Sequence, residues 1–154
     1  MSSNDWGVTR QVAAEVILAD HLRLEGALHL LARTTYPPGP ETPLELLNRP
    51  EAFFALTLEE GVALVSKAQV VTVVCSDDVA LLDPDRASVA KAAGLTVELH
   101  GGTEYRGYAT FELPPSNARL LDFVNSPGQF FALWGDDTIR YINKSFVRLI
   151  RPLD

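Results

Sequence analysis

A nine-residue block that occurs twice constrains this chain more than any other feature of its sequence. Residues 48–56 align without gaps on residues 125–133, and six of the nine positions are identical. The similarity continues on both sides at this same shift, from residue 48 to residue 125, which we call offset 77. Closer to the N-terminus, Gly26 aligns with Gly107, a shift that we call offset 81. Chance is a poor explanation for six identities flanked by collinear similarity. We therefore interpret residues 13–75 and 95–152 as two divergent copies of one unit.

Each copy has the pattern of a small β unit. The change of offset places four extra residues in the first copy, within the proline-rich loop Thr34–Pro43. Apolar and polar residues alternate in short runs separated by turn residues, which is typical of strands. In the second copy the expected strands are 96–100, 104–113, 130–134, 138–142 and 146–151, with a helical turn at Leu120–Asn125 that directs Leu121 and Val124 inward. The first copy lacks a glycine where the second has Gly101 and Gly102, so we expect their first turns to differ.

These patterns predict a mostly β protein made of two tandem five-stranded barrels of the Sm or SH3 type. The first unit spans residues 1–78 with an N-terminal segment, and the second spans 79–154. A helix is expected to join them over Pro84–Ala93, because Asp83 is a good N-cap and Gly94 a good C-terminal stop; a weaker helix is expected over Asn4–Ala14. We expect the units to pack as an isologous pair. Whether they form separate barrels or share one sheet stays open.

Two segments of the second copy resemble the motifs of Sm-like proteins. Leu99–Tyr108 resembles the first motif, including its turn and the glycine of a bent strand, and Ile139–Val147 resembles the second. The chain has Asn143-Lys144 where Sm proteins place Arg-Gly, and Glu112 and Asn117 lie one position away from the residues that read RNA bases. The resemblance implies a small β-barrel and, as an alternative function, RNA binding. The repeated Asn-x-Pro block is also similar to small uncharacterised bacterial β domains, which implies no activity.

Charge and hydropathy limit the partners of the chain. Its net charge of −7 makes general nucleic-acid binding unlikely, because an acidic chain repels phosphate backbones. The N-terminus lacks the features of a signal peptide, and the apolar runs are too short to cross a membrane. We therefore expect a soluble protein of the bacterial cytoplasm. The single cysteine, Cys75, ends an apolar strand and is expected to be an inert core residue.

The titratable residues form no pattern typical of an active site. None of the three histidines has the spacing of a zinc site. The acidic pairs Glu59-Glu60 and Asp136-Asp137 occupy equivalent turns, and Asp77-Asp78 opens the linker; turn formation and solvation explain all three. The sequence thus predicts a non-catalytic protein without a metal or a cofactor.

The aromatic pairs are the strongest candidates for an interaction surface. Phe53-Phe54 and Phe130-Phe131 lie in expected strands, so the two rings of each pair point to opposite faces. One ring should enter the core, and the other needs cover from another element, the other copy or another chain. Trp134 shares a face with Phe130 and should be partly buried. These five residues predict a protein-interaction or scaffold module that binds a protein partner or itself. A core on both faces of these strands is the open alternative.

A small basic cluster supports the alternative function. Arg140, Asn143, Lys144 and Arg148 lie around the expected second Sm motif. Such a cluster is typical of an RNA or anion site. With so many acidic residues elsewhere, a solvated strand face is the more common explanation.

Overall fold

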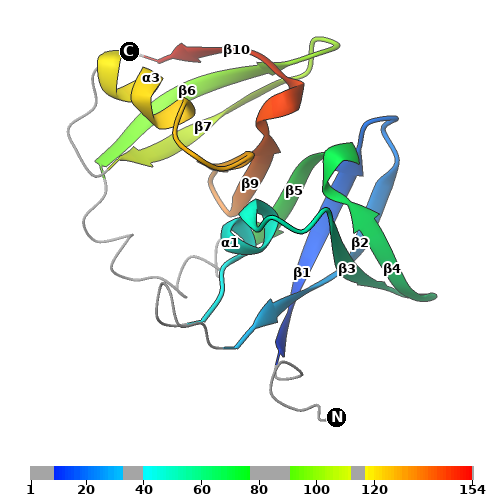
Figure 1. Cartoon of the computed structure of the whole chain (residues 1–154). Helices are drawn as coiled ribbons and strands as arrows, with labels where there is room; N and C mark the ends of the chain where they lie inside the picture. Colours follow the sequence, from blue (N-terminus) through cyan, green and yellow to red (C-terminus); the bar gives the residue numbers. More distant parts are fainter. Residues whose placement is uncertain (1–8, 33–39, 77–90, 112–116, 154) are drawn as a thin grey trace.

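The computed structural model describes residues 9–32, 40–76, 91–111 and 117–153. These residues form ten strands, shown in Figure 1: β1 (Thr9–Leu18), β2 (Arg23–Leu31), β3 (Phe53–Leu58), β4 (Gly61–Ser66), β5 (Val70–Ser76), β6 (Lys91–Leu99), β7 (Glu104–Phe111), β8 (Phe130–Trp134), β9 (Thr138–Asn143) and β10 (Val147–Pro152). Two helices, α1 (Pro43–Asn48) and α3 (Asn117–Val124), and two 3₁₀ turns, η2 (Lys67–Gln69) and η4 (Lys144–Phe146), lie between them. The expectation of a mostly β protein is confirmed.

All the described strands join one antiparallel sheet. Its order is β10-β6-β7-β8-β9-β5-β1-β2-β3-β4, and the sheet is not closed, so β10 and β4 are its two edges. Two separate closed barrels are therefore not formed. The question that the sequence left open is answered in favour of one shared sheet.

The two halves of the sheet have the same strand order. The first half (β1–β5 with α1) runs β5-β1-β2-β3-β4, and the second half (β6–β10 with α3) runs β10-β6-β7-β8-β9. The starts of β3, β4, η2 and β5 recur at the starts of β8, β9, η4 and β10, in each case at offset 77. The start of β2 recurs at the start of β7 at offset 81. Secondary structure therefore follows both offsets of the sequence alignment.

Hydrogen bonds outside the strand ladders also recur at these offsets. The pairs are Lys67 N to Ala52 O with Lys144 N to Gln129 O, Ala19 N to Gln69 O with His100 N to Phe146 O, and His21 N to Leu18 O with Gly102 N to Leu99 O. The side-chain amines of Lys67 and Lys144 donate to the corresponding carbonyls of Arg49 and Ser126, at 3.1 and 2.7 Å. His21 adopts a φ of 70° where Gly102 has 95°. The two first turns share this hydrogen bond and this positive φ, but Gly101 also has a φ of 95°, whereas its counterpart Asp20 has no positive φ. The turns therefore differ at this position, as expected.

The halves are joined by strands that do not correspond to each other. β5 pairs with β9, with Val73 opposite Tyr141 and Cys75 opposite Ile139. At offset 77, β5 corresponds to β10 and β9 corresponds to β4. In an isologous contact every pairing occurs twice, so β10 would also pair with β4. These two strands are instead the opposite edges of the sheet. The expected isologous packing is therefore wrong, and the contact is heterologous.

The predicted linking helix over Pro84–Ala93 is wrong for the part of it that the structure describes. Lys91–Ala93 belong to β6, and Gly94 lies within that strand opposite Tyr108; residues 84–90 lie outside the described residues. β1 begins at Thr9, so the helix expected over Asn4–Ala14 is wrong from that residue onward. The strand pairing of β6 with β7 and β10 outweighs the helix propensity of its alanines.

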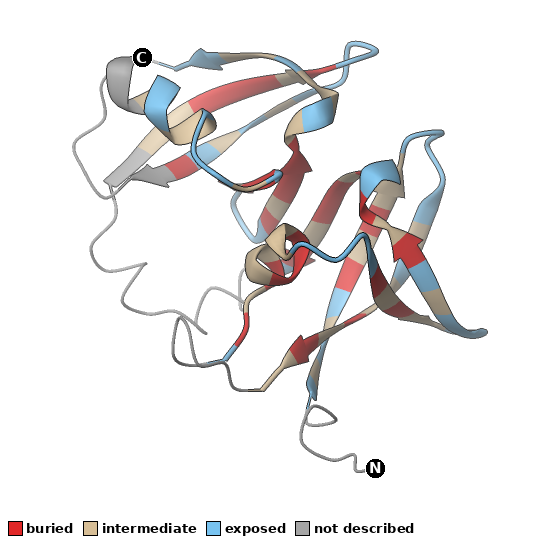
Figure 2. Cartoon of the chain, in the orientation of Figure 1, coloured by how far each residue is buried: buried red, intermediate tan, exposed pale blue. Residues whose placement is uncertain are grey.

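Two apolar clusters lie on opposite faces of β8 and β9. Cluster 1 is the interior of the first half together with Phe130, Ile139 and Tyr141 from the second half. Cluster 2 is the interior of the second half and includes Phe131 and Leu133. The alternation of side chains along a strand accounts for this division. Figure 2 shows that buried residues continue from one half of the sheet into the other.

The helices close these clusters. Leu46 and Leu47 of α1 lie in cluster 1, and Leu120 and Phe123 of α3 pack on cluster 2. The expected inward position of Leu121 is wrong, because its side chain is exposed.

A capping box starts α1. Thr42 Oγ1 accepts a hydrogen bond from Glu45 N, and Glu45 Oε1 accepts one from Thr42 N. The preceding residue, Glu41, is buried, pairs with Arg49 and accepts a hydrogen bond from Leu31 N. These contacts fix α1 against β2, and its far end then reaches β8.

Candidate interaction surface

The outer face of β3 and β4 carries exposed apolar side chains. Ala55 is opposite Leu64 and Thr57 is opposite Val62, so these residues share one face with Phe53. Phe53, Val62 and Leu64 are 57, 64 and 73 % exposed. We call these three residues the β4 face. Because it adjoins the open edge β4, it offers apolar contact and unpaired backbone groups together.

The residues that correspond to the β4 face in the second half are buried. At offset 77, Phe53, Val62 and Leu64 correspond to Phe130, Ile139 and Tyr141, which are 2, 1 and 4 % exposed. All three of these counterparts belong to cluster 1, so the first half covers them. The same three positions are therefore a buried contact in one half and open surface in the other.

The aromatic candidates divide between core and surface. Phe54 and Phe131 are buried within the interiors of their own halves, and Phe130 is buried against the other half. Phe53 remains exposed. Trp134 is half-buried and packs on cluster 1 with Phe130, as its position on the strand predicts.

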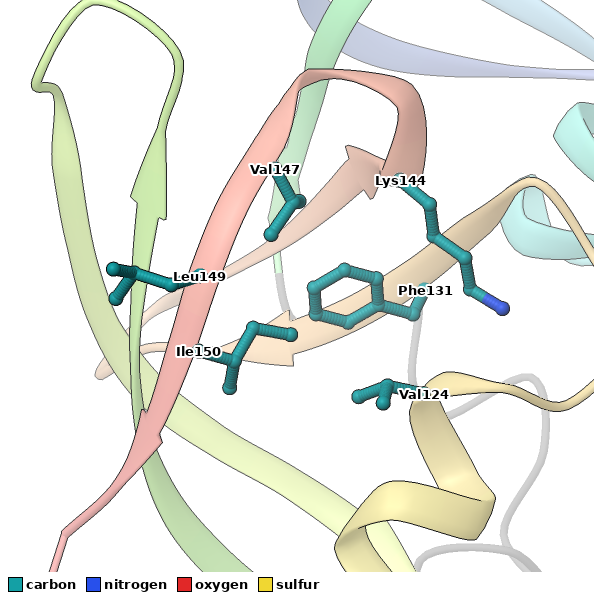
Figure 3. A pocket seen from close by; sticks show the side chains of 6 residues that line it. All are labelled: Val124, Phe131, Lys144, Val147, Leu149 and Ile150. Carbon is teal, nitrogen blue, oxygen red and sulfur yellow. The ribbon is translucent and has the colours of Figure 1, made fainter.

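A pocket of about 300 Å³ lies beside the other edge of the sheet. It is lined by Val124 at the end of α3, Phe131 of β8, Lys144 of η4, and Val147, Leu149 and Ile150 of β10. Figure 3 shows the apolar side chains of Val124, Val147 and Ile150 around the ring of Phe131. We call it the β10 pocket.

The corresponding place in the first half is occupied. The counterparts of Val124, Phe131, Val147 and Ile150 are residues of cluster 1: Leu47, Phe54, Val70 and Val73. Phe130 belongs to the same cluster, and the side chain of Asn48 holds its backbone there. The cluster that contains these four counterparts therefore also contains a phenylalanine of the second half.

Two of the basic-cluster candidates are used inside the fold. Asn143 is 1 % exposed, and its Nδ2 donates to the carbonyls of Lys67 and Val70. Arg140 is half-buried, stacks on the ring of Tyr105 at 3.9 Å and reaches Thr72. Burial lowers the pKa of Arg140, while Tyr105 acts in the opposite direction.

The other two candidates also have partners within the chain. Lys144 Nζ donates to the carbonyl of Ser126, and burial lowers the pKa of this amine. Arg148 is exposed on β10 and pairs with Glu98. The structure therefore places the four residues along β9, η4 and β10 but does not gather them into one open basic surface.

The remaining titratable residues that the sequence singled out are dispersed. Cys75 is buried, which raises its pKa to about 12 and leaves little reactive thiolate at neutral pH. His29 forms a hydrogen bond with Thr57, and His21 and His100 are exposed at turns. Glu59-Glu60 and Asp136-Asp137 lie at exposed turns, and Asp77-Asp78 lie outside the described residues. Within the described part of the chain, no three His, Cys, Asp or Glu side chains are grouped to hold a metal ion.

Sequence reasoning found Phe53 but missed Val62 and Leu64. A signal for both was present, because the alignment at offset 77 matches them with Ile139 and Tyr141, which are also large and apolar. Their exposure could not be read from the sequence, since it depends on which strand of one half meets the other.

No protein family, curated protein or solved structure matches this chain. The Sm-like resemblance therefore stays a prediction. None of the helices among the described residues is both long and apolar enough to span a membrane.

Proposed function

We propose that this protein is an internally duplicated β protein that acts as a protein-interaction module through its β4 face. The observation that carries the proposal is the contrast in burial between the two halves. Phe53, Val62 and Leu64 are exposed, whereas their counterparts Phe130, Ile139 and Tyr141 are covered by protein. The same apolar positions form a buried contact in the second half. In the first half they are therefore suited to burial against a partner protein.

The recurring elements support duplication of the unit. Element starts recur at offset 77 and at offset 81, and so do hydrogen bonds outside the strand ladders. The glycines of the second strands support it as well. An added Cβ at Gly26 would collide with the carbonyl of Thr57, and one at Gly107 would collide with the carbonyl of Trp134, the counterpart of Thr57.

The edge strand β4 supplies the second requirement for binding a protein. One side of β4 pairs with β3, and the other side has no neighbour among the described strands. A partner strand could add to this edge through main-chain hydrogen bonds while its side chains meet the β4 face. RNA binding is less well supported, because Asn143 is buried and Arg140, Lys144 and Arg148 are engaged within the fold.

Site-specific photo-crosslinking in the organism that encodes the chain tests the proposal. A photoreactive phenylalanine analogue replaces Val62 on the β4 face or Leu22, which is 50 % exposed in the β1–β2 turn, as the control. We expect protein adducts at position 62 in at least severalfold excess over position 22. Equal adduct formation at both positions would contradict a binding role for the β4 face.

A further inference from the structure

We propose that the partner of the β4 face is the β10 pocket of a second copy of this chain, so that copies associate head to tail. This inference rests on the proposed function and names its partner. Its basis is the contact between β5 and β9, which the chain makes once within itself.

A heterologous contact between the two halves uses one surface of each half. The corresponding surface of the other half stays free in each case. Within the chain, β9 of the second half pairs with β5 of the first half. The corresponding strands are β4 and β10, and these are the two open edges of the sheet. A second chain can therefore pair its β4 with β10 of the first by the same geometry. Repetition of this step gives a closed ring or an open filament.

The register of the internal contact predicts the register between chains. Thr72 opposite Ile142 becomes Leu149 opposite Val65, and Val73 opposite Tyr141 becomes Ile150 opposite Leu64. Cys75 corresponds to Pro152, which lacks a backbone N–H. The ladder between chains therefore has at most one hydrogen-bond donor fewer than the internal ladder between β5 and β9.

The side chains at the two edges are complementary. In the internal contact, Phe130 belongs to the same apolar cluster as Leu47, Phe54, Val70 and Val73. Between chains, the exposed Phe53 would enter the β10 pocket, which is lined by the counterparts of those four residues. Asn125, exposed at the position that corresponds to Asn48, would bind the backbone of Phe53 as Asn48 binds that of Phe130.

The charges at the two edges have opposite signs. The exposed Arg148 and Arg151 lie on β10 and share one acidic partner, Glu98, so one positive charge of this group stays unbalanced. The exposed Glu59 and Glu60 lie at the turn that precedes β4. The predicted register places Leu153 opposite Gly61 and thus brings the Arg151 end of β10 towards that turn. This arrangement favours the approach of unlike edges over like edges.

Sedimentation and light scattering over a hundredfold range of concentration test the association. The wild-type chain should reach masses of several times 16.8 kDa. Leu64→Glu should weaken association at least tenfold, because it places a charge on the β4 face. Val124→Glu should do the same by filling the β10 pocket, and Asn125→Ala should weaken association without filling it. Leu22→Glu is the control, because it makes the same change at an exposed leucine of the β1–β2 turn. This variant should assemble like the wild type.

Mixing two blocked variants tests the head-to-tail arrangement. Leu64→Glu retains an intact β10 pocket, and Val124→Glu retains an intact β4 face. Each alone should be a monomer, and the mixture should form a complex of two chains and nothing larger. A dimer formed by Val124→Glu alone would reveal symmetric β4 pairing and overturn the proposal. Thermal melts establish that each variant is folded, and Val62→Glu replaces Leu64→Glu if the latter is not.

The failure of this inference can be distinguished from the failure of the proposed function. A wild-type chain that stays monomeric throughout the concentration range overturns self-assembly. If position 62 then still crosslinks in excess to a different protein, the β4 face is an interaction surface with another partner. Assembly of Leu64→Glu at the wild-type mass would likewise exclude β4 from the contact.

Discussion

The side-chain amide of Asn48 pairs with both backbone polar groups of Phe130. Asn48 Nδ2 donates to Phe130 O at 3.1 Å, and Phe130 N donates to Asn48 Oδ1 at 2.8 Å. The amide acts as a substitute for a neighbouring strand at the start of β8. It ties α1 of the first half to the second half, 82 residues away along the chain.

This pair predicts different effects for two asparagines that correspond in the repeat. Asn48→Ala should lower the free energy of unfolding by about 1–3 kcal/mol, because it leaves the Phe130 N–H and carbonyl without these partners. Asn125→Ala, at an exposed position, should change it by less than about 0.5 kcal/mol. Urea denaturation in the Leu64→Glu background removes any contribution from assembly. Equal losses for the two variants would contradict the role assigned to Asn48.

The hydrogen bonds of Asn143 predict a loss of stability that depends on its Nδ2 donor rather than on the size of the side chain. Its Nδ2 donates to the carbonyls of Lys67 and Val70, while its Oδ1 accepts from Ser145 N and Gln129 Nε2. Asn143→Asp keeps the shape but turns a carboxylate towards two carbonyl oxygens. We expect a loss of about 2–4 kcal/mol at neutral pH.

The pH dependence of Asn143→Asp separates charge from shape. Burial beside the two carbonyls raises the folded-state pKa of the new carboxyl above its unfolded value. The variant should therefore regain stability as the pH falls and lose it as the pH rises through the folded pKa. Denaturation of variant and wild type at pH 4 and pH 7 measures this, and a pH-independent difference would contradict the donor role. If Asn143 instead contacts RNA, the substitution would alter RNA binding and leave unfolding unchanged.

Gly107 predicts a steric effect that is specific to its strand. A Cβ at this position would collide with the carbonyl of Trp134 on β8, whereas a Cβ at Gly135 would make ordinary contacts with Thr138. Gly107→Ala should destabilise the fold by about 2 kcal/mol or more, because β7 must move away from β8. Gly135→Ala is the matched control and should be nearly neutral. Thermal melts of both variants check this, and similar melting temperatures would show that β7 does not approach β8 so closely.

Cys75 predicts a loss of stability at alkaline pH. Burial raises the pKa of its thiol from 9.0 to about 12 in the folded state. Between these values the unfolded chain loses the thiol proton and the folded chain keeps it, so stability falls as the pH rises. The free-energy difference between the wild type and Cys75→Ala should therefore shrink by about 2 kcal/mol from pH 9 to pH 11. A constant difference would mean that the thiol ionises equally well in the folded chain.

Much of the strand layout follows from local pattern. The turn at Gly101-Gly102, the alternation along Phe130–Trp134 and the repeat at offset 77 predict strands that the structure contains. The linking helix failed because Ala92 and Ala93 have high helix propensity, yet backbone pairing with β7 and β10 places them in β6. Propensity is a local quantity of a few tenths of a kcal/mol per residue, and strand pairing across the chain exceeds it.

The sequence by itself indicated most of the strands, the recurring nine-residue block, and the division of each phenylalanine pair between two faces, so that the second ring needs cover from another element, the other copy or another chain. Only the tertiary structure decided which ring receives it. Phe53 and Phe130 have identical neighbours at three following positions, yet one is exposed and the other buried. The physical reason is that β9, and not β4, pairs with β5. Two like strands compete for one edge, and an alternating pattern that is nearly the same in both cannot specify which of them occupies it.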